Sequence, residues 1–470
     1  MPAPAPNALA GGAGSDYAAF LAGKVPRARP RGIAPQPMPS HLFDFQQHVA
    51  AFLIEQGCGA GFLDTGLGKG RTALECLRQT TEASNGIGLH LVPLAVARQI
   101  ESEGRALGYD IRVVRSQADV RPGINVCNYD RLDQLDANSF GAVSLDESSI
   151  LKSFTGATTR ALIEKFANTR FKFAWTATPA PNDHMELGQH AEFLSVMPSN
   201  EMLMRWFVSD QTQMGRYRLK SHGESDFWNW MASWSRCAET PADLGFDASR
   251  FVLPELSVIR HRVAGDVRAP AGALFVQNLS ATNIHDVKRQ TAEARALAVA
   301  DLVNAETGDS WVIWCDTDYE ADQLTKALPH AKEIRGSHSI EKKEDTLAAF
   351  ADGSLRALIT KSSITGYGLN WQHCARMAFV GRSFSYESWY QAVRRCWRFG
   401  QTRPVHVHLA VAEGEDQIGR VITRKATDHS RMKRAMADAM ARHRQAATVK
   451  VPYLPLHSAR FPSWLISSAA

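Results

Sequence analysis

The chain has 470 residues, of which 44% are hydrophobic and 21% charged, and it carries a formal net charge of +5. This length exceeds what one compact core supports, so we expect two or three domains of an ordinary globular protein. The mild positive charge permits contact with nucleic acid but does not by itself predict it.

The seven cysteines lie far apart and form no CxxC pair. This spacing argues against a zinc site or a disulfide framework and favours free thiols in a reducing compartment. No apolar run approaches the ~20 residues needed to span a bilayer, and the first residues lack the pattern of a signal peptide. We therefore expect a cytoplasmic protein without a membrane anchor.

The first elements along the chain differ sharply in composition. Residues 1–41 form a leader rich in Pro, Ala and Gly, which cannot bury enough apolar surface to order itself. From residue 42 to residue 56 the apolar side chains recur at helical spacing, which predicts a helix that ends at the glycines of segment 57–61.

After this helix, short β-type runs alternate with helical segments. Four runs come first and four more follow in the second half, at 88–92, 124–127, 142–145, 171–175, 311–315, 357–360, 377–380 and 405–410. Such alternation predicts mostly parallel sheets covered by helices on both faces. Because the alternation stops and restarts, the pattern predicts two α/β domains, at 42–185 and 286–450.

The segment between these domains, 186–285, breaks the alternation and is interpreted as a largely helical insertion plus linker. It holds several tryptophans, of which Trp228 and Trp234 are expected in the core. A strongly basic helix is predicted over 413–443, with either a solvated face or a nucleic-acid surface. Residues 451–470 are a tail.

A glycine-rich turn, Asp64-Thr65-Gly66-Leu67-Gly68-Lys69, leads into a helix that is predicted to begin near Gly70. Such a turn aims backbone N–H groups and the positive end of a helix at phosphate oxygens. The ammonium of Lys69 would neutralise charge on the β- and γ-phosphates of a nucleotide. Because glycine-rich turns are common, this motif alone does not establish a nucleotide-binding site, and a second motif is needed.

The second motif is an apolar run, 142–145, which is followed by the two acids Asp146 and Glu147. A carboxylate at the end of a strand, opposite a phosphate loop, stands where a Mg²⁺ ligand is needed. Asp146 would hold the ion, and Glu147 would orient and deprotonate the attacking water. Without the phosphate loop, a surface acid pair would be the simpler interpretation.

In the second half, the segment 391–401 (QAVRRCWRFGQ) spaces Arg395 and Arg398 three residues apart, which would place both on one helical face. Two guanidinium groups on one face indicate anion binding or solvated salt bridges. Here they would reach the γ-phosphate and stabilise charge in the transition state, as an arginine finger does.

Taken in order, these blocks resemble the motifs of superfamily 2 helicases (DEAD/DEAH-box-like), specifically of the SNF2-like branch in the form that phages encode. The matching segments are 42–47 (glutamine motif), 64–69 (motif I), 91–94 (motif Ia), 128–130 (the NYD element), 146–149 (motif II), 176–187 (motif III and its SNF2-like continuation), 360–370 (motif V) and 391–401 (motif VI). The resemblance runs from about residue 17 to about residue 443.

The resemblance implies two RecA-like lobes in tandem, with ATP and Mg²⁺ between them and duplex or single-stranded DNA across both. It assigns nucleotide binding to Gln46, Thr65, Gly66, Leu67, Gly68, Lys69, Gly70 and Gly366, with Gln46 as the adenine reader. It assigns the coupling of hydrolysis to movement to Thr176, Thr178 and Gln391. DNA phosphate and sugar contacts fall to Arg98, Asn128, Thr360 and Lys361, although each of these four could instead be a solvated polar residue.

One departure from the family pattern bears on activity. Motif I normally places Ser or Thr after its lysine, and that hydroxyl binds Mg²⁺, whereas this chain has Gly70. Thr72 is a poor substitute because two residues along a helix turn a side chain by about 200°. Since Mg²⁺ commonly keeps several waters, a water would fill the vacant place. We expect weaker metal binding and slower turnover, with loss of hydrolysis as the extreme case.

The leading hypothesis is therefore an ATP-dependent DNA translocase or helicase. Gly70 motivates a second hypothesis, an ATP-gated DNA-binding module with weak or no hydrolysis. A third is an RNA helicase, which the SNF2-like continuation of motif III and the arginine-rich segment 391–401 disfavour. We expect a monomer, and a partner protein that supplies nuclease or targeting activity fits a motor without such modules.

Overall fold

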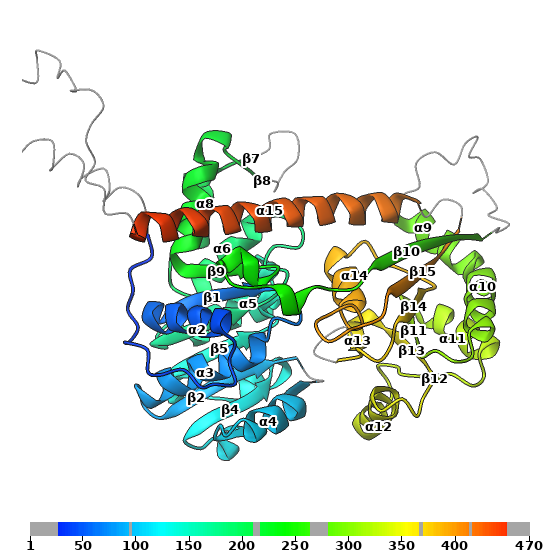
Figure 1. Ribbon diagram of the computed structural model, residues 1–470, viewed down its shortest axis with the longest axis horizontal. Coiled ribbons are helices and arrows are strands. Elements are labelled where there is room, and N and C mark those ends of the chain that lie inside the picture. Colours follow the sequence, from blue (N-terminus) through cyan, green and yellow to red (C-terminus); the bar gives the residue numbers. More distant parts are fainter. Residues whose placement is uncertain are drawn as a thin grey trace, which may run out of the picture.

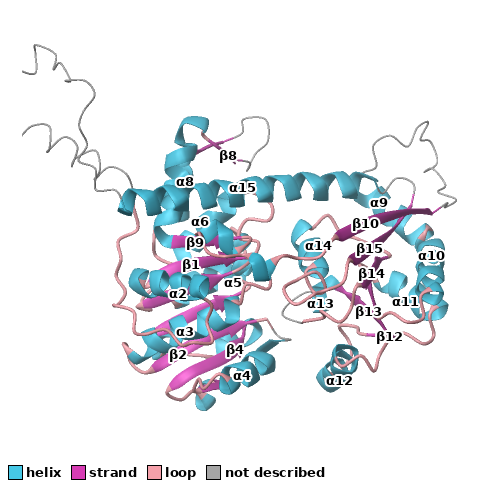
Figure 2. Ribbon diagram, in the orientation of Figure 1, coloured by secondary structure: helices cyan, strands magenta, loops and turns pink. Residues whose placement is uncertain are grey.

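The computed structural model describes residues 27–93, 96–209, 217–263, 281–365, 370–412 and 416–448. They form two parallel sheets, each flanked by helices, which we call lobe 1 and lobe 2 (Figures 1 and 2). Lobe 1 has the strand order β3-β4-β2-β5-β6-β1-β9, and lobe 2 has the order β10-β15-β14-β11-β13-β12. This architecture confirms the predicted fold, two parallel-sheet lobes of the RecA-like type in tandem with a C-terminal helix.

Lobe 1 is built from strands that read as nearly continuous apolar runs, because helices cover both faces of a parallel sheet. Its strands are β1 (Cys58–Leu63), β2 (Ile87–Val92), β3 (Ile111–Val113), β4 (Gly123–Asn128), β5 (Ala142–Asp146), β6 (Phe171–Trp175) and β9 (Ser235–Ala238). Its helices are α2 (Asp44–Gln56), α3 (Lys69–Glu82), α4 (Ala97–Ala106), α5 (Ala157–Lys165), α6 (Leu187–Phe193), α7 (Ser199–Trp206) and α8 (Glu224–Trp234).

Lobe 2 repeats this pattern around a smaller sheet. Its strands are β10 (Leu256–Val263), β11 (Trp311–Cys315), β12 (Lys332–Glu333), β13 (Ala357–Lys361), β14 (Arg376–Phe379) and β15 (Val405–Ala412). Its helices are α9 (Ala281–Gln290), α10 (Ala292–Ala305), α11 (Asp318–Ala327), α12 (Ile340–Ala351), α13 (Ser362–Thr365) and α14 (Tyr386–Val393). All eight β-type runs taken from the sequence are strands, with bounds that differ by at most a few residues.

The last helix, α15 (Asp416–Thr448), crosses from lobe 2 to lobe 1 (Figure 1). Near its start, Ile418 and Ile422 pack against Tyr386 of lobe 2. Further along, Met432 and Met436 are buried in the core of lobe 1. One continuous helix therefore connects the hydrophobic cores of both lobes.

The segment 186–285 differs from the expected helical insertion. It holds α6, α7 and α8, but also a strand of each large sheet, since β9 pairs with β1 in lobe 1 and β10 pairs with β15 in lobe 2. A short antiparallel pair, β7 (Phe207–Ser209) with β8 (Tyr217–Leu219), precedes α8 and β9 in the chain. Trp228 and Trp234 are buried in the core of lobe 1, as expected. The strands were missed because their stability comes from pairing with distant strands, which leaves no local pattern.

The leader also differs from expectation over residues 27–41. The N–H groups of Arg31, Gly32 and Ile33 donate to the carbonyls of Gln56, Glu55 and Ile54 at 3.0–3.2 Å. The last carbonyls of a helix have no partner within that helix, and the leader supplies partners to those at the end of α2. Backbone pairing orders this segment although its composition is poor in apolar residues. Residues 1–26 and the predicted tail lie outside the described residues.

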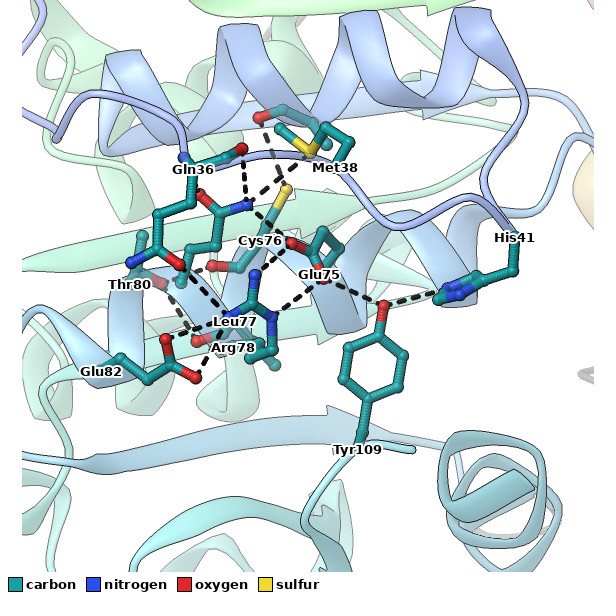
Figure 3. A network of polar contacts seen from close by, with 12 residues as sticks. Gln36, Met38, His41, Glu75, Cys76, Leu77, Arg78, Thr80, Glu82 and Tyr109 are labelled. Atoms are coloured by element: carbon teal, nitrogen blue, oxygen red, sulfur yellow. Dashed lines mark hydrogen bonds and ion pairs between the residues drawn. The ribbon is translucent and has the colours of Figure 1, made fainter. Parts of the chain in front are cut away.

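Figure 3 shows how the same segment reaches α3 through a polar network. The carboxylate of Glu75 is buried and accepts hydrogen bonds from Gln79 at 2.6 Å, Arg78 at 2.7 Å and the Tyr109 hydroxyl at 3.1 Å. Tyr109 also contacts the ring nitrogen of His41 at 3.1 Å. Full satisfaction of a buried carboxylate makes this network a structural part of lobe 1.

All seven cysteines are buried free thiols. Over the described residues, no helix is long and apolar enough to cross a membrane.

Candidate active site

Three loops meet at one edge of the lobe 1 sheet, because β5, β6 and β1 are parallel neighbours whose carboxyl ends share that edge. The glycine-rich turn follows β1, the segment Thr176-Ala177-Thr178 follows β6, and Asp146 with Glu147 ends β5. The sheet therefore brings together residues that are about a hundred positions apart in the sequence.

The glycine-rich turn needs glycine at two positions. Gly66 and Gly68 have φ of 90° and 77°, a left-handed backbone that other residues rarely adopt. Moreover, a Cβ at Gly68 would lie 2.2 Å from Nε2 of Gln46. That nitrogen donates to the carbonyl of Leu67 at 2.9 Å. Gln46, the expected adenine reader, thus lines the cavity and also holds the loop.

Lys69 begins α3, and its ammonium donates to the carbonyl of Leu63 at 3.1 Å, inside the loop. Burial lowers the pKa of Lys69, while Glu147 and Asp146 act in the opposite direction. A buried ammonium bonded to its own loop is poised to exchange that carbonyl for an anionic ligand.

Of the two acids near this lysine, Glu147 is buried and Asp146 is partly buried. Burial raises the pKa of Glu147 to about 7, with Lys69 opposing the rise and Asp146 adding to it. Burial also raises the pKa of Asp146. Glu147 has a left-handed backbone, with φ of 49°. Two neighbouring carboxylates with a raised pKa form a site that a cation would stabilise.

These residues fit Mg²⁺, which takes few protein ligands and completes its shell with water and phosphate oxygens. Among the described residues, no group of three or more His, Cys, Asp or Glu side chains converges on one point. A site with one or two carboxylates suits an ion that arrives with a nucleotide.

Thr176 and Thr178 lie between the glycine-rich turn and the acids. Both are fully buried, and the hydroxyl of Thr176 accepts the N–H of Thr178 at 3.1 Å. This buried segment lies at the end of β6, the strand between β1 and β5, but neither threonine lines the cavity among the described residues.

Lobe 2 closes the site through the segment after α14. This helix ends at Val393, so Arg395 and Arg398 lie in the turns that follow and not on one helical face, as the spacing predicted. The chain turns there because α14 stops and the N–H of Arg395 bonds the carbonyl of Ala392 at 3.2 Å. Both arginines nevertheless line the same cavity as the glycine-rich turn.

That cavity has a volume of about 370 Å³. Its lining includes Gln46, Thr65, Gly66, Gly68, Lys69, Gly70, Asp146, Glu147, Arg395, Arg398 and Phe399. Burial, together with Arg395 and Arg394, lowers the pKa of Arg398 to about 9. The cavity therefore has cations from both lobes around a space where an anion would be stabilised.

Several side chains connect the lobes beside the cavity. Gln391 of α14 donates to Glu147 at 3.4 Å. Arg394 forms an ion pair with Asp64 at 2.5 Å, and the hydroxyl of Tyr390 bonds the same carboxylate. A role was predicted for Gln391 but none for Asp64, Arg394 or Tyr390. Asp64 and Arg394 lie inside the segments that resemble motifs I and VI, and Tyr390 lies one residue before the second of them.

Gly70 lines the cavity, and a Cβ at this position would meet no heavy atom of the described residues within 4 Å. Thr72 is fully buried, and its hydroxyl donates to the carbonyl of Gly68 at 3.1 Å. Helical geometry thus directs Thr72 away from the cavity, as expected, and the place beside Gly70 is open.

The residues predicted to contact DNA do not gather in one place. Arg98 is exposed and pairs with Glu344 of lobe 2 at 3.2 Å, and Lys361 pairs with Asp318 at 2.7 Å. Asn128 is partly buried at the end of β4. Thr360 is fully buried and contacts Thr365 at 3.2 Å, so its side chain is not exposed for contact with DNA in this conformation. Gly366 lies outside the described residues.

Comparison with known proteins finds a match in lobe 2. Residues 294–400 match the family model described as the helicase conserved C-terminal domain. No match is found among curated proteins. The chain is similar to the Sulfolobus solfataricus SWI2/SNF2 ATPase core in complex with dsDNA, at 14% identity and a TM-score of 0.41, over 90% of this chain and 99% of that one. A likeness this weak carries no conclusion for this chain, whereas the family match extends from α10 past Arg398. Residues 294–400 of lobe 2 therefore resemble the helicase conserved C-terminal domain.

Proposed function

We propose that the protein is an ATP-dependent DNA translocase or helicase that hydrolyses ATP between its two lobes. The observation that carries this proposal is the single cavity lined by Lys69, the acids Asp146 and Glu147, and the arginines Arg395 and Arg398. Phosphoryl transfer depends mainly on positioning and charge stabilisation, and this cavity has a phosphate loop, a carboxylate pair and two guanidinium groups. The helicase C-terminal domain that provides the arginines supports the same conclusion.

In this proposal the phosphate loop 64–69 holds the triphosphate through its backbone N–H groups, and Lys69 pairs with the β- and γ-phosphates. Asp146 would hold Mg²⁺, which supplies charge neutralisation on those phosphates when bound. Glu147 accepts the proton of the attacking water at its carboxylate. Its pKa of about 7 suits a general base that works near neutral pH.

Arg395 and Arg398 would stabilise the charge that develops on the γ-phosphate in the transition state. They come from the other lobe, so hydrolysis would depend on how the lobes sit against each other. Gln391 bonds Glu147 across the same gap, and the buried loop of Thr176 and Thr178 lies beside it. These contacts provide a physical route from hydrolysis to relative movement of the lobes.

DNA is the proposed partner. Arg98 and Lys361 have carboxylate partners in ion pairs with at least one exposed member, and exposed pairs of this kind contribute little stability. A DNA phosphate can therefore replace the carboxylate partner of Arg98 or Lys361 with little loss of stability. Binding of this type would weaken as salt concentration rises.

The second candidate is an ATP-gated DNA-binding module with little hydrolysis. Gly70 favours it, since no hydroxyl stands at that position and Thr72 points away from the cavity. The two candidates agree on ATP binding and differ in turnover.

Phosphate release should be measured without nucleic acid and with duplex DNA, single-stranded DNA or RNA. We expect stimulation by DNA, abolished binding of ATP in Lys69→Ala, and retained binding without turnover in Glu147→Gln. Binding of ATP without release in the presence of DNA would instead establish the gated module. Stronger stimulation by RNA would establish an RNA helicase, and unchanged nucleotide affinity in Lys69→Ala would refute the phosphate-loop assignment.

A further inference from the structure

The carboxylate of Asp64, the first residue of the phosphate loop, is held by the other lobe. Arg394 donates to it at 2.5 Å, and Tyr390 bonds its second oxygen. The backbone N–H of Thr65 donates to that oxygen at 2.7 Å. Asp64 thus belongs to lobe 1 by sequence, while its closest ionic partner, Arg394, belongs to lobe 2.

The helix α15 adds a second cation to this carboxylate. The ammonium of Lys433 lies 3.9 Å from Asp64 and 4.0 Å from Glu239. Its side chain is only 2% exposed, and its nitrogen makes no hydrogen bond to the residues that the structure describes. A buried ammonium at this distance contributes charge but no directional bond, so it compensates Asp64 without fixing its geometry.

The charges around Asp64 favour its ionised form strongly. Burial alone would raise the pKa of the Asp64 carboxyl, but Lys433 and Arg394 outweigh this effect and lower it to about 2. The carboxylate is therefore ionised at any physiological pH. Removing the guanidinium of Arg394 would leave it with Lys433 as its nearest cation.

Arg394 holds more than one atom of the phosphate loop. Its Nε donates to the hydroxyl of Thr65 at 2.6 Å, and its Nη2 donates to the Thr65 carbonyl at 3.2 Å. The next residue, Arg395, lines the cavity, as does Arg398. In this short segment, Arg394 therefore binds the phosphate loop, while Arg395 and Arg398 line the cavity.

We propose that Arg394 is a positioning residue, which sets Arg395 and Arg398 against the phosphate loop through its contacts with Asp64 and Thr65. The inference rests on the proposed function, because the two arginines matter only if a nucleotide is hydrolysed there. A planar guanidinium that makes several directed bonds fixes register better than a lysine ammonium does. A misplacement of about 1 Å at a reacting centre costs roughly a hundredfold in rate.

The test uses the full-length protein and the variants Arg394→Met, Arg394→Lys, Asp64→Asn and the double variant Asp64→Asn with Arg394→Met. The matched control is Arg403→Met, which removes a guanidinium of lobe 2 that pairs with Asp309 at 2.6 Å within the same lobe. Melting temperature and nucleotide affinity establish that each variant is folded.

For Arg394→Met we expect kcat to fall by roughly a hundredfold, while KM for ATP changes by less than about threefold. Arg394→Lys should recover only part of this loss, and the double variant should be no slower than the slower single variant, since both changes break one contact. Arg403→Met should match the wild-type protein. A kcat for Arg394→Met within about threefold of the wild type, or additive losses in the double variant, would overturn the inference and leave the proposed function standing.

A second measurement does not depend on hydrolysis. Because all seven natural cysteines are buried, Ala118→Cys in lobe 1 and Lys326→Cys in lobe 2, both exposed positions, can carry a fluorescent pair. Without nucleotide, Arg394→Met should lower energy transfer relative to the parent and Arg403→Met should not. If the wild-type protein fails to hydrolyse ATP, the proposed function fails, and the energy transfer between the two labels alone tests the inference. Unchanged energy transfer in Arg394→Met then overturns it.

Discussion

The carboxylate of Glu147 in lobe 1 lies 3.4 Å from the side-chain amide of Gln391 in lobe 2. The bond joins the proposed general base to the helix that precedes the arginines of the cavity. Glu147 is buried among Asp146 and Glu387, with Lys69 as its main counter-charge. Its ionised form is therefore unfavourable in the folded protein, and this has a measurable consequence.

Glu147→Gln should stabilise the nucleotide-free protein at alkaline pH. The pKa of Glu147 rises on folding to about 7, so the folded state holds its proton more tightly, and ionisation costs stability as pH rises from the unfolded value toward 7. At pH 8 we expect a gain of roughly 2–3 kcal/mol, which disappears below about pH 4. Thermal unfolding of both proteins as a function of pH measures this difference in stability, with Glu164→Gln, at an exposed position, as the control. A difference that is independent of pH would contradict the burial of an ionisable carboxylate there.

Arg398→Ala should leave ATP affinity nearly intact and remove most DNA-stimulated turnover. Arginine fingers contribute roughly 10³–10⁵ in rate in related phosphoryl-transfer systems. Single-turnover hydrolysis and nucleotide binding separate the two effects, and Arg395→Ala provides the comparison. A loss smaller than about tenfold in Arg398→Ala, with a larger loss in Arg395→Ala, would move the finger to Arg395.

Gly70→Thr should raise the ATPase rate and lower the Mg²⁺ concentration needed for half-maximal activity. The structure leaves room for the change, since a Cβ at Gly70 meets no described heavy atom within 4 Å, and the hydroxyl would replace one water on the ion. Gly70→Val is the matched control because it has the same shape without the hydroxyl. Titration of Mg²⁺ against rate checks this. Equal behaviour of the Thr and Val variants would show that no hydroxyl is needed.

Gly32→Ala should undock the ordered part of the leader. A Cβ at Gly32 would lie 1.8 Å from the carbonyl oxygen of Ile54, so the backbone pairing with the end of α2 cannot persist. We expect a loss of about 1–3 kcal/mol in unfolding free energy and faster tryptic cleavage after Arg31. Gly308→Ala, where a Cβ would meet no described atom within 4 Å, is the control. Unchanged cleavage would mean that the leader does not depend on this contact.

Local sequence patterns are enough to predict the two-lobed fold and the loops at the carboxyl ends of its strands. Buried parallel strands read as short apolar runs, so all eight predicted strands are present. The phosphate loop and the acid pair at the end of β5 can also be predicted locally, because a left-handed turn requires glycine and the end of a strand is recognised from a few residues. The cavity brings together Lys69, Glu147, Arg395 and Arg398, as their predicted roles require.

Contacts between residues that are far apart in the chain could not be predicted from local patterns. The strands β9 and β10 exist because β1 and β15 offer unpaired edges, and the leader is ordered because the end of α2 has carbonyls to satisfy. No local pattern separates Arg394 from Arg395 and Arg398, yet the folded structure pairs Arg394 with Asp64 of the other lobe. Pairing energy between residues that are far apart in the chain leaves no periodic or compositional trace, so these features appear only when the chain is folded.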